Sequence, residues 1–316
     1  MKNAVLCRVV VRMLLHLLAA SSFAQVIPSQ SSVASQTSLL LDKRVFVVFL
    51  GTGTPRPDPT RQGPSLAIVA NGQAYLVDAG TGLVRQAAAA FLQGVTALQP
   101  NQLDIAFLTH LHSDHTLGLA DLMLTPWVMG RTAPLRLYGP VGTKAMVNAL
   151  QQAYSEDIEL RIHGLEHQTR TGQEVAVQEI QPGVVYQDEN VKVTAFAVKH
   201  GSWKEALGYR FDADGKSIVV SGDTRPTESV IRSCNGCDLL IHEAYSFEAG
   251  QNAYFASFHT SAAELGKIAA QARPKMLVVT HLVVGPRSSA ARAVQEIQQN
   301  FEGRIAVAKD LEIIAP

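Results

Sequence analysis

The sequence predicts a folded protein of the α/β class. Its 316 residues are 47% hydrophobic and 17% charged, a composition that argues against a disordered chain, a collagen-like repeat or a coiled coil. From Val45 onward, short runs rich in β-branched residues alternate with alanine-rich stretches of helical length, and no fixed repeat period occurs. No long linker marks a second domain, so we expect residues 45–316 to form one domain with a single large core.

The predicted strands and helices alternate along the chain. The runs with strand character are Val45 to Leu50, Ala74 to Val77, Asp104 to Thr109, Val191 to Val198, Ser217 to Ser221, Leu239 to His242 and Met276 to Thr280. The stretches with helical character are Leu83 to Leu92, Thr116 to Leu124, Thr143 to Tyr154, Ser261 to Ala270 and Ser289 to Asn300. Most polar motifs directly follow one of these strands, which is where an α/β scaffold displays reactive side chains.

The first 24 residues have the pattern of a secretory signal peptide. A basic start with Lys2, Arg8 and Arg12 precedes an apolar run over residues 13–20 and a small-residue cleavage site before Gln25. A membrane anchor is the alternative, but the apolar run is shorter than the roughly 20 residues that a spanning helix needs. We therefore expect cleavage, a periplasmic or secreted location, and no stable membrane association afterwards.

Residues 25–44 are rich in Ser and Gln without a sustained period, so we expect a flexible leader before the folded domain. Two cysteines, Cys234 and Cys237, remain after the signal peptide with its Cys7 is removed. In an oxidising compartment this pair is able to close a small disulfide loop, and the alternative is two unrelated loop thiols. The sequence leaves both readings open.

A cluster of histidines marks a candidate metal site. His110, His112 and His115 lie within six residues, with Asp114 between them, directly after a predicted strand. Imidazole nitrogens and carboxylate oxygens are the ligands of zinc and similar ions. In an extended chain residues 110 and 112 share one side, whereas Asp114 and His115 enter a turn and face another locus. The segment therefore offers one pair of ligands to each of two metals.

The pattern H-x-H-x-D-H at 110–115, followed by Gly118, resembles the signature of the metallo-β-lactamase superfamily of metallohydrolases. The opening over residues 50–65 resembles the branch that contains ribonuclease Z and arylsulfatase-type hydrolases. The same resemblance extends to four later motifs, S-G-D-T-R-P, H-E-A-Y, F-H-T-S and T-H-L, in the order of that branch. It implies the four-layer αββα sandwich of the metallo-β-lactamase fold, beginning near Val45.

The resemblance also implies a set of metal ligands and two zinc ions. The first ion is expected on His110, His112 and His200, and the second on Asp114, His115 and His281, with Asp223 bridging both. Two metals about 3.5 to 4 Å apart share a hydroxide, lower its pKa and stabilise charge in the transition state. Ligand type leaves Mn²⁺ or Fe open as alternatives to Zn²⁺.

Catalytic and supporting roles follow from the same resemblance. Asp114 is expected to orient the attacking hydroxide or accept its proton, and His259 to protonate the leaving group. We expect His242 and Glu243 to contact the metal ligands or to line the substrate pocket rather than to bind metal directly, with Glu243 orienting one of the ligands. Asp78 is expected to support the ligand loop by hydrogen bonds rather than to touch metal.

The segment 51–65 contains four prolines and is predicted to be a stiff loop. It lacks the lysine of a P-loop and the spacing of a dinucleotide fingerprint, which argues against nucleotide binding. Arg56 and Arg61 from this loop, together with Arg225, are candidates for recognising an anionic ester. The alternative for each arginine is a surface salt bridge.

The charge pattern leads us to expect a small anionic ester as substrate rather than a nucleic acid. Lys plus Arg and Asp plus Glu are 27 each, and residues 156–189 hold eight acidic residues against two arginines. Binding of a polyanion depends on lysines and arginines that release counterions. An exported protein would also not meet precursor tRNA, the substrate of ribonuclease Z.

Our leading expectation is therefore an exported dinuclear zinc hydrolase acting on a sulfate or phosphate ester. The alternatives are a ribonuclease Z-like enzyme that processes the 3′ ends of tRNA, and a zinc-dependent binding or sensor protein without turnover. A homodimer stays open.

Overall fold

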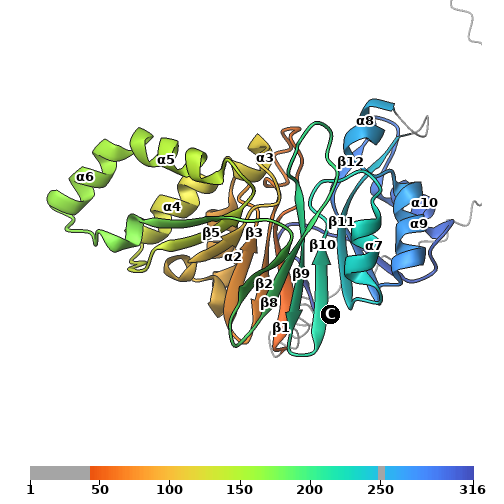
Figure 1. Ribbon diagram of the computed structural model, residues 1–316, viewed down its shortest axis with the longest axis horizontal. Coiled ribbons are helices and arrows are strands. Elements are labelled where there is room, and N and C mark those ends of the chain that lie inside the picture. The colour runs from red at the N-terminus through yellow and green to blue at the C-terminus, as the bar shows by residue number, and fades with distance from the viewer. Residues whose placement is uncertain (1–42, 248–252) are drawn as a thin grey trace, which may run out of the picture.

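The computed structural model describes residues 43–247 and 253–316 (Figure 1). The expected signal peptide (1–24) lies outside the described residues, as does the expected leader (25–44) except for its last two residues. Cleavage before Gln25 and the periplasmic or secreted location stay predictions. N-terminal sequencing of the purified protein tests the first of them.

The described residues form two seven-stranded sheets with helices outside both. The strands of the first sheet, in spatial order, are β14 (Ile313–Ile314), β1 (Val45–Gly51), β2 (Ser65–Ala70), β3 (Gln73–Val77), β4 (Ile105–Phe107), β5 (Leu135–Gly139) and β6 (Val175–Glu179). The strands of the second are β13 (Arg304–Val307), β12 (Met276–Val284), β11 (Leu239–Ser246), β10 (Lys216–Val220), β9 (Leu207–Ala213), β8 (Lys192–Ala197) and β7 (Gly183–Gln187). Strands β3 to β6 and β10 to β13 pair in parallel, and the other neighbours pair antiparallel.

The helices divide between the two outer layers (Figure 1). Those beside the first sheet are α2 (Leu83–Leu92), α4 (Leu119–Val128), α5 (Thr143–Ala153) and α6 (Ser155–His163). Those beside the second sheet are α7 (Glu228–Cys234), α9 (Ala262–Ala272) and α10 (Ala290–Gln298). Two short helices, α3 (Ser113–Thr116) and α8 (Ala253–Phe258), lie at the end of the sandwich where the polar motifs gather.

The alternation of side chains along the strands explains the four layers. In β1, Val47 and Phe49 pack between the two sheets, whereas Phe46 and Val48 pack under the helices of the first layer. Every residue of β1 is buried because both faces of its sheet are covered. A third apolar cluster fills the space between the second sheet and its helices. The αββα sandwich of the metallo-β-lactamase fold is confirmed.

Two predicted strands prove longer than expected, and one predicted helix is divided. Strands β11 and β12 continue past His242 and Thr280, which brings their last residues into the candidate site. The helix expected over residues 116–124 is replaced by α3 and α4, which Gly118 separates. A Cβ on Gly118 would lie 2.2 Å from the carbonyl oxygen of Gly80, so only glycine permits this close approach.

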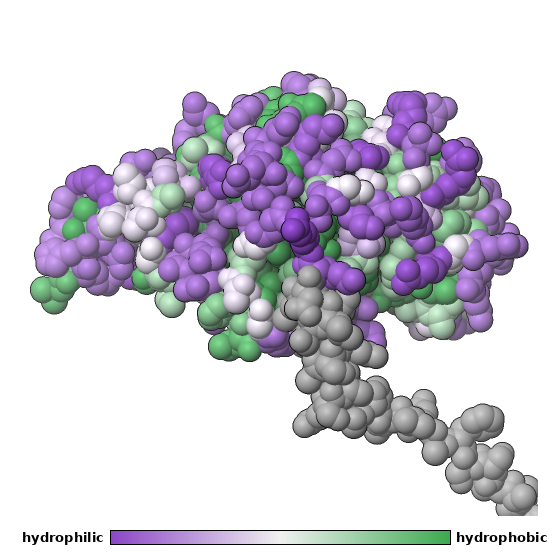
Figure 2. All heavy atoms as spheres, turned by 90° about the horizontal axis from the view of Figure 1, so that it is seen from below, coloured by the Kyte–Doolittle hydropathy of each residue, from purple (hydrophilic) through white to green (hydrophobic). Residues whose placement is uncertain are grey.

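Helices α5 and α6 extend from the body at the end far from α8 (Figure 1). The sequence predicted α5 but not α6, whose first turn carries Glu156 and Asp157 and whose last turn carries Arg161 and His163. This distribution suits the helix dipole. The face seen in Figure 2 is mainly hydrophilic, with hydrophobic residues in small scattered groups.

Cys234 and Cys237 form a disulfide between the end of α7 and the start of β11. Both cysteines are buried against the apolar cluster that lies between the second sheet and its helices. Of the two readings that the sequence left open, the structure contains the disulfide. No described helix is long and apolar enough to cross a bilayer.

Candidate metal centre

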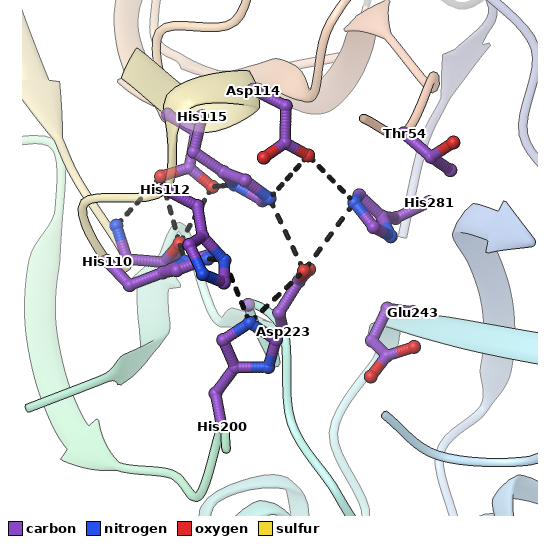
Figure 3. A network of polar contacts seen from close by, with 12 residues as sticks. Thr54, His110, His112, Asp114, His115, His200, Asp223, Glu243 and His281 are labelled. Atoms are coloured by element: carbon purple, nitrogen blue, oxygen red, sulfur yellow. Dashed lines mark hydrogen bonds and ion pairs between the residues drawn. The ribbon is translucent and has the colours of Figure 1, made fainter. Parts of the chain in front are cut away.

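The candidate ligands come from four strand ends that meet at one edge of the sandwich (Figure 3). His110 and His112 follow β4, and Asp114 and His115 belong to the short helix α3. The remaining ligands come from the second sheet: His200 follows β8, Asp223 follows β10, and His281 lies in β12. Segments far apart in the sequence therefore converge on one buried cluster.

His281 reaches the cluster through a β-bulge. The register between β11 and β12 pairs Glu243 with Thr280 and then Ala244 with Leu282, so His281 is the extra residue. It has a φ of 45°, a left-handed value that non-glycine residues seldom adopt. Bulges of this kind redirect a side chain beside active sites. Asp78 also has a positive φ, 60°, so two residues of the site lie in strained backbone.

The first group of ligands consists of His110, His112 and His200. The Nδ1 atom of His112 lies 3.0 Å from Nε2 of His110 and 3.0 Å from Nε2 of His200. Two ligands bound at about 2.1 Å in tetrahedral geometry are separated by roughly 3.4 Å. Three nitrogens at this spacing suit one face of a tetrahedral site.

The second group consists of Asp114, His115 and His281. The Oδ2 atom of Asp114 lies 3.5 Å from Nε2 of His115 and 3.3 Å from Nε2 of His281. Oδ2 of Asp223 lies 3.5 Å from each of the same two nitrogens, and 3.9 Å from Nε2 of His200. Asp223 is therefore the residue whose carboxylate contacts both groups.

The chemistry of these side chains fits divalent metal ions. Nε2 of His115 is buried and has no hydrogen-bond partner among the described residues, although two carboxylates face it. Burial lowers the pKa of His110, His112 and His200, which keeps these imidazoles in the neutral form that binds metal. Burial raises the pKa of Asp223, but His281 and His115 outweigh it and hold that pKa well below its usual value.

Asp78 supports the ligand loop from beneath. Its Oδ2 atom accepts a hydrogen bond from Nδ1 of His115 at 2.8 Å, and its Oδ1 accepts from the backbone N–H of Thr109 at 2.8 Å. The Thr109 hydroxyl also donates to Asp78 and lies 3.0 Å from Nδ1 of His110. Such contacts orient a ligating histidine and select its tautomer.

Glu243 and His259 form a second polar pair beside the ligands. Oε1 of Glu243 accepts backbone N–H bonds from Thr224 and Thr260, both at 3.1 Å, and lies 3.2 Å from Nδ1 of His259. Burial lowers the pKa of His259, but Glu243 and Asp223 outweigh it and raise it to about 9. His259 is therefore held as a protonated imidazole within 3.9 Å of Asp223.

His242 is fully buried in β11, and its Nδ1 atom contacts the carbonyl oxygen of Glu243 at 2.6 Å. It belongs to none of the groups of side chains that are spaced to hold a metal among the described residues.

An open cleft adjoins the cluster. It has a volume of about 510 Å³ and is lined by the 54–63 loop on one side and by Ser113, Asp114 and Leu117 on the other. Figure 3 shows Thr54 of this loop beside His281, at the rim of the site. A substrate in the cleft would meet Asp114 first.

Comparison with known proteins identifies the family. Residues 73–282 match the profile described as "Beta-lactamase superfamily domain". The chain belongs to the metallo-β-lactamase superfamily. This superfamily member is 35% identical over 277 residues to ribonuclease Z of Mycobacterium bovis, covering 84% of this chain and 96% of that protein. It is 34% identical over 280 residues to ribonuclease Z of Mycobacterium marinum, with 84% and 97% covered.

Solved structures of this superfamily share the fold. The metallo-β-lactamase fold protein YhfI from Bacillus subtilis is 18% identical, with a TM-score of 0.68 and 86% and 99% of the two chains covered. The short form of human tRNase Z is 24% identical, with a TM-score of 0.64 and 85% and 98% covered. The chain is thus a metal-dependent hydrolase acting on ester bonds, which excludes a binding or sensor protein without turnover.

The leading expectation from the sequence for the reaction, hydrolysis of small sulfate or phosphate esters, is wrong. So is the expectation that a nucleic acid is an unlikely partner. The finding that overturns both is the ribonuclease Z identity of relatives that match the chain over nearly their whole length. The arylsulfatase-type resemblance has no support from these comparisons.

Several carboxylates of the acidic segment have partners within the protein. Arg161 binds the carboxylates of Asp157 and Glu166. Asp188 accepts hydrogen bonds from the hydroxyls of Tyr75 and Tyr186 at 2.6 and 2.8 Å. Glu179 accepts hydrogen bonds from the backbone N–H groups of Gly142 and Lys144, at the start of α5. These carboxylates thus have structural partners, and their number along the sequence did not predict the substrate class.

The three candidate arginines have different surroundings. Arg61 donates hydrogen bonds to the carbonyl oxygens of Thr52 and Leu282, which ties the 51–65 loop to β12. Arg56 is exposed and donates to the carbonyl oxygen of Val284 at 3.3 Å. Arg225 is exposed and makes no ion pair within residues 43–247 and 253–316. The structure gives Arg61 a structural role and leaves Arg225 accessible.

We predict that Arg61→Ala lowers the free energy of unfolding by about 2 kcal/mol, because half-buried carbonyl oxygens lose their donor. The matched change Arg56→Ala should stay within about 0.5 kcal/mol, since that side chain is exposed. Urea denaturation measures both. An unchanged stability for Arg61→Ala, with a raised KM, would instead indicate that Arg61 binds substrate.

Two residues at the site were missed from the sequence. Asp310 accepts hydrogen bonds from the backbone N–H groups of Thr52 and Gln62, at 2.9 and 2.6 Å, and so holds both ends of the loop. Trp203 donates from Nε1 to Nε2 of His112 at 2.7 Å. Asp310 is 258 residues from Thr52, and no local sequence pattern predicts a contact between residues so far apart. Trp203 lies only three residues after His200, and this proximity could have indicated that Trp203 contacts the site.

Proposed function

We propose that the chain is an endonuclease of the ribonuclease Z type, which hydrolyses a phosphodiester bond at the 3′ end of precursor tRNA with two Zn²⁺ ions as cofactors. The observation that carries this proposal is the 35% identity to a ribonuclease Z across 96% of that protein's length. The buried cluster of histidines and aspartates supports it, because phosphodiester hydrolysis at a two-metal site needs such ligands. We further propose that residues 45–316 act as one hydrolase domain.

In this proposal His110, His112 and His200 hold one ion, and Asp114, His115 and His281 hold the other. Asp223 contacts both groups, so its carboxylate would set their separation. When bound, two such ions activate water and neutralise charge that develops on the phosphate. The mixture of neutral imidazoles and carboxylates is the donor set that suits zinc.

Two side chains of the protein would move the protons. Asp114, at the rim of the cleft, would orient the attacking water and accept its proton. His259 would donate a proton to the departing ribose oxygen, since Glu243 keeps its imidazole protonated. Glu243 itself is held in place by the backbone N–H groups of Thr224 and Thr260. The carboxylate and the imidazole thus have opposite roles, as acid–base catalysis of a displacement requires.

A cleavage assay with the zinc-loaded full chain tests this proposal. The substrate is a precursor tRNA transcript with a 3′ trailer, and the control is a single-stranded RNA that contains the same trailer sequence. We expect one cut at the 3′ end of the tRNA body in the transcript, and a rate at least about 10²-fold lower on the control. Equal cutting of both RNAs, or no cutting of either by a chain that carries its metals, would contradict the proposal.

A further inference from the structure

The outer ring nitrogens of four predicted ligands, His110, His112, His115 and His200, have partners that indicate which tautomer each adopts. A ligating histidine ordinarily donates its second ring N–H to an oxygen acceptor, which leaves the other nitrogen free for the metal. Nδ1 of His115 faces Oδ2 of Asp78 at 2.8 Å, and Nδ1 of His200 faces the carbonyl oxygen of Phe258 at 2.9 Å. Both histidines are thereby fixed with Nε2 available.

His110 follows the same rule. The hydroxyl of Thr109 donates its proton to Asp78, so its oxygen is left to accept from Nδ1 of His110 at 3.0 Å. Nε2 of His110 is then the unprotonated atom, and it points toward His112.

His112 reverses the rule. Its metal-facing atom is Nδ1, and its outer atom Nε2 lies 2.7 Å from Nε1 of Trp203. An indole N–H is a donor and never an acceptor, so Nε2 of His112 has to accept this bond. A neutral imidazole carries one N–H, which must then sit on Nδ1, the atom that faces the metal locus. The Trp203 bond and metal coordination by neutral His112 therefore exclude each other.

The surroundings of Trp203 hold the indole in this position. Its ring is half-buried against the apolar cluster that includes Phe196 and Val198, and it meets the His112 ring edge-on at a centroid distance of 5.1 Å. Its backbone N–H donates to the carbonyl oxygen of His200 at 3.0 Å. Residues 200–206 contain neither helix nor strand, so no helix or sheet hydrogen bonds fix the segment that carries the indole.

We propose that Trp203 is a metal-responsive positioning residue. It holds His112 in the tautomer that cannot bind metal through Nδ1, and this hydrogen bond breaks when the locus of His110, His112 and His200 fills. Loading of that locus is then weaker than its ligands alone would allow. The proposal rests on the predicted metal ligands but not on the RNA substrate, so a failed tRNA assay leaves it standing.

The first test measures zinc affinity. Trp203→Phe keeps an aromatic ring against His112 and His110 and removes the N–H donor. We expect the zinc dissociation constant of the locus of His110, His112 and His200, measured by competition with a chelator, to tighten by about 3- to 10-fold, the worth of one hydrogen bond. If Trp203 only braces His112, the same change should weaken binding by about 10- to 100-fold. Weaker or unchanged affinity would overturn the proposal.

Trp127→Phe is the matched control. The sequence has two tryptophans, and Trp127 is fully buried with its Nε1 donating to the carbonyl oxygen of Thr169 at 2.7 Å. Its replacement removes an indole N–H bond of the same length without touching the metal locus. We expect its zinc affinities to equal those of the wild-type chain.

The second test follows the indole of Trp203 in the wild-type chain. In the wild-type chain, indole N–H resonances are recorded by NMR during a zinc titration, with Trp127→Phe serving to assign the Trp203 signal. We expect the Trp203 resonance to shift as the locus of His110, His112 and His200 fills, while the Trp127 resonance stays in place. A Trp203 signal that is unchanged at saturating zinc would show that the bond survives metal binding, and would overturn the proposal.

Discussion

Replacing Asp223 by alanine is expected to abolish hydrolysis and to weaken the binding of both metal ions. Its Oδ2 atom lies within 3.9 Å of ligand nitrogens from both groups, and one carboxylate therefore serves two loci. We expect activity on precursor tRNA to fall by more than about 10³-fold, beyond the roughly 10² to 10³ that loss of a single charge-stabilising group costs. Elemental analysis should show fewer than two ions per chain.

Asp238→Asn is the control for the loss of a buried carboxylate. Asp238 lies at the start of β11, where it binds the backbone N–H of Ser217 and the Nζ of Lys275 away from the metal cluster. This variant should lose stability but keep its metals and its specific activity. Two tightly bound ions and a near-wild-type rate in Asp223→Ala would show that the bridging assignment is wrong.

Replacing His259 by alanine is expected to slow substrates according to their leaving groups. Cleavage of precursor tRNA expels a ribose oxygen, which is a poor leaving group, so we expect a loss of about 10² to 10⁴-fold when the proton donor is removed. Hydrolysis of bis(p-nitrophenyl) phosphate should fall far less, because its aryl oxide departs without a proton. The rate constants of both reactions are compared on the same metal-loaded preparation.

The ratio of the two losses separates proton donation from damage to the pocket. Metal content is measured first, because His259 lies 3.9 Å from Asp223 and its removal must not empty the site. Equal losses on both substrates would mean that His259 positions substrate or supports the pocket. The role as general acid would then be withdrawn.

The local spacing of residues predicted the first four ligands of the site, from His110 to His115, and the family resemblance supplied the other three. The pattern from His110 to His115 places ligands at a strand end and in the first turn of a helix, and the structure has the end of β4 and α3 there. The alternation of apolar runs likewise predicted most of the inner strands. Both inferences rest on periodicities of the chain, which the sequence displays directly.

Long-range geometry could not be derived from local spacing, and the family resemblance named His281 as a ligand without showing how it reaches the site. His281 enters the site because β12 continues past Thr280 and bulges with a positive φ, which depends on pairing with β11 rather than on its own neighbours. The sequence likewise does not show that Asp188 and Glu179 accept hydrogen bonds inside the fold, since Tyr75 and Gly142, which donate these bonds, lie elsewhere in the chain. Counting charge along a segment therefore gave the wrong substrate class.

The most direct test of the dinuclear centre is to measure the hydrolysis rate as a function of the number of metal ions bound per chain. The purified chain is stripped with a chelator, and zinc is returned in steps while bound metal and the rate of phosphodiester hydrolysis are recorded together. We predict that the rate stays low at one equivalent and reaches its plateau at two ions per chain. Full activity at one equivalent, or in a chain that holds no metal at all, would contradict the account.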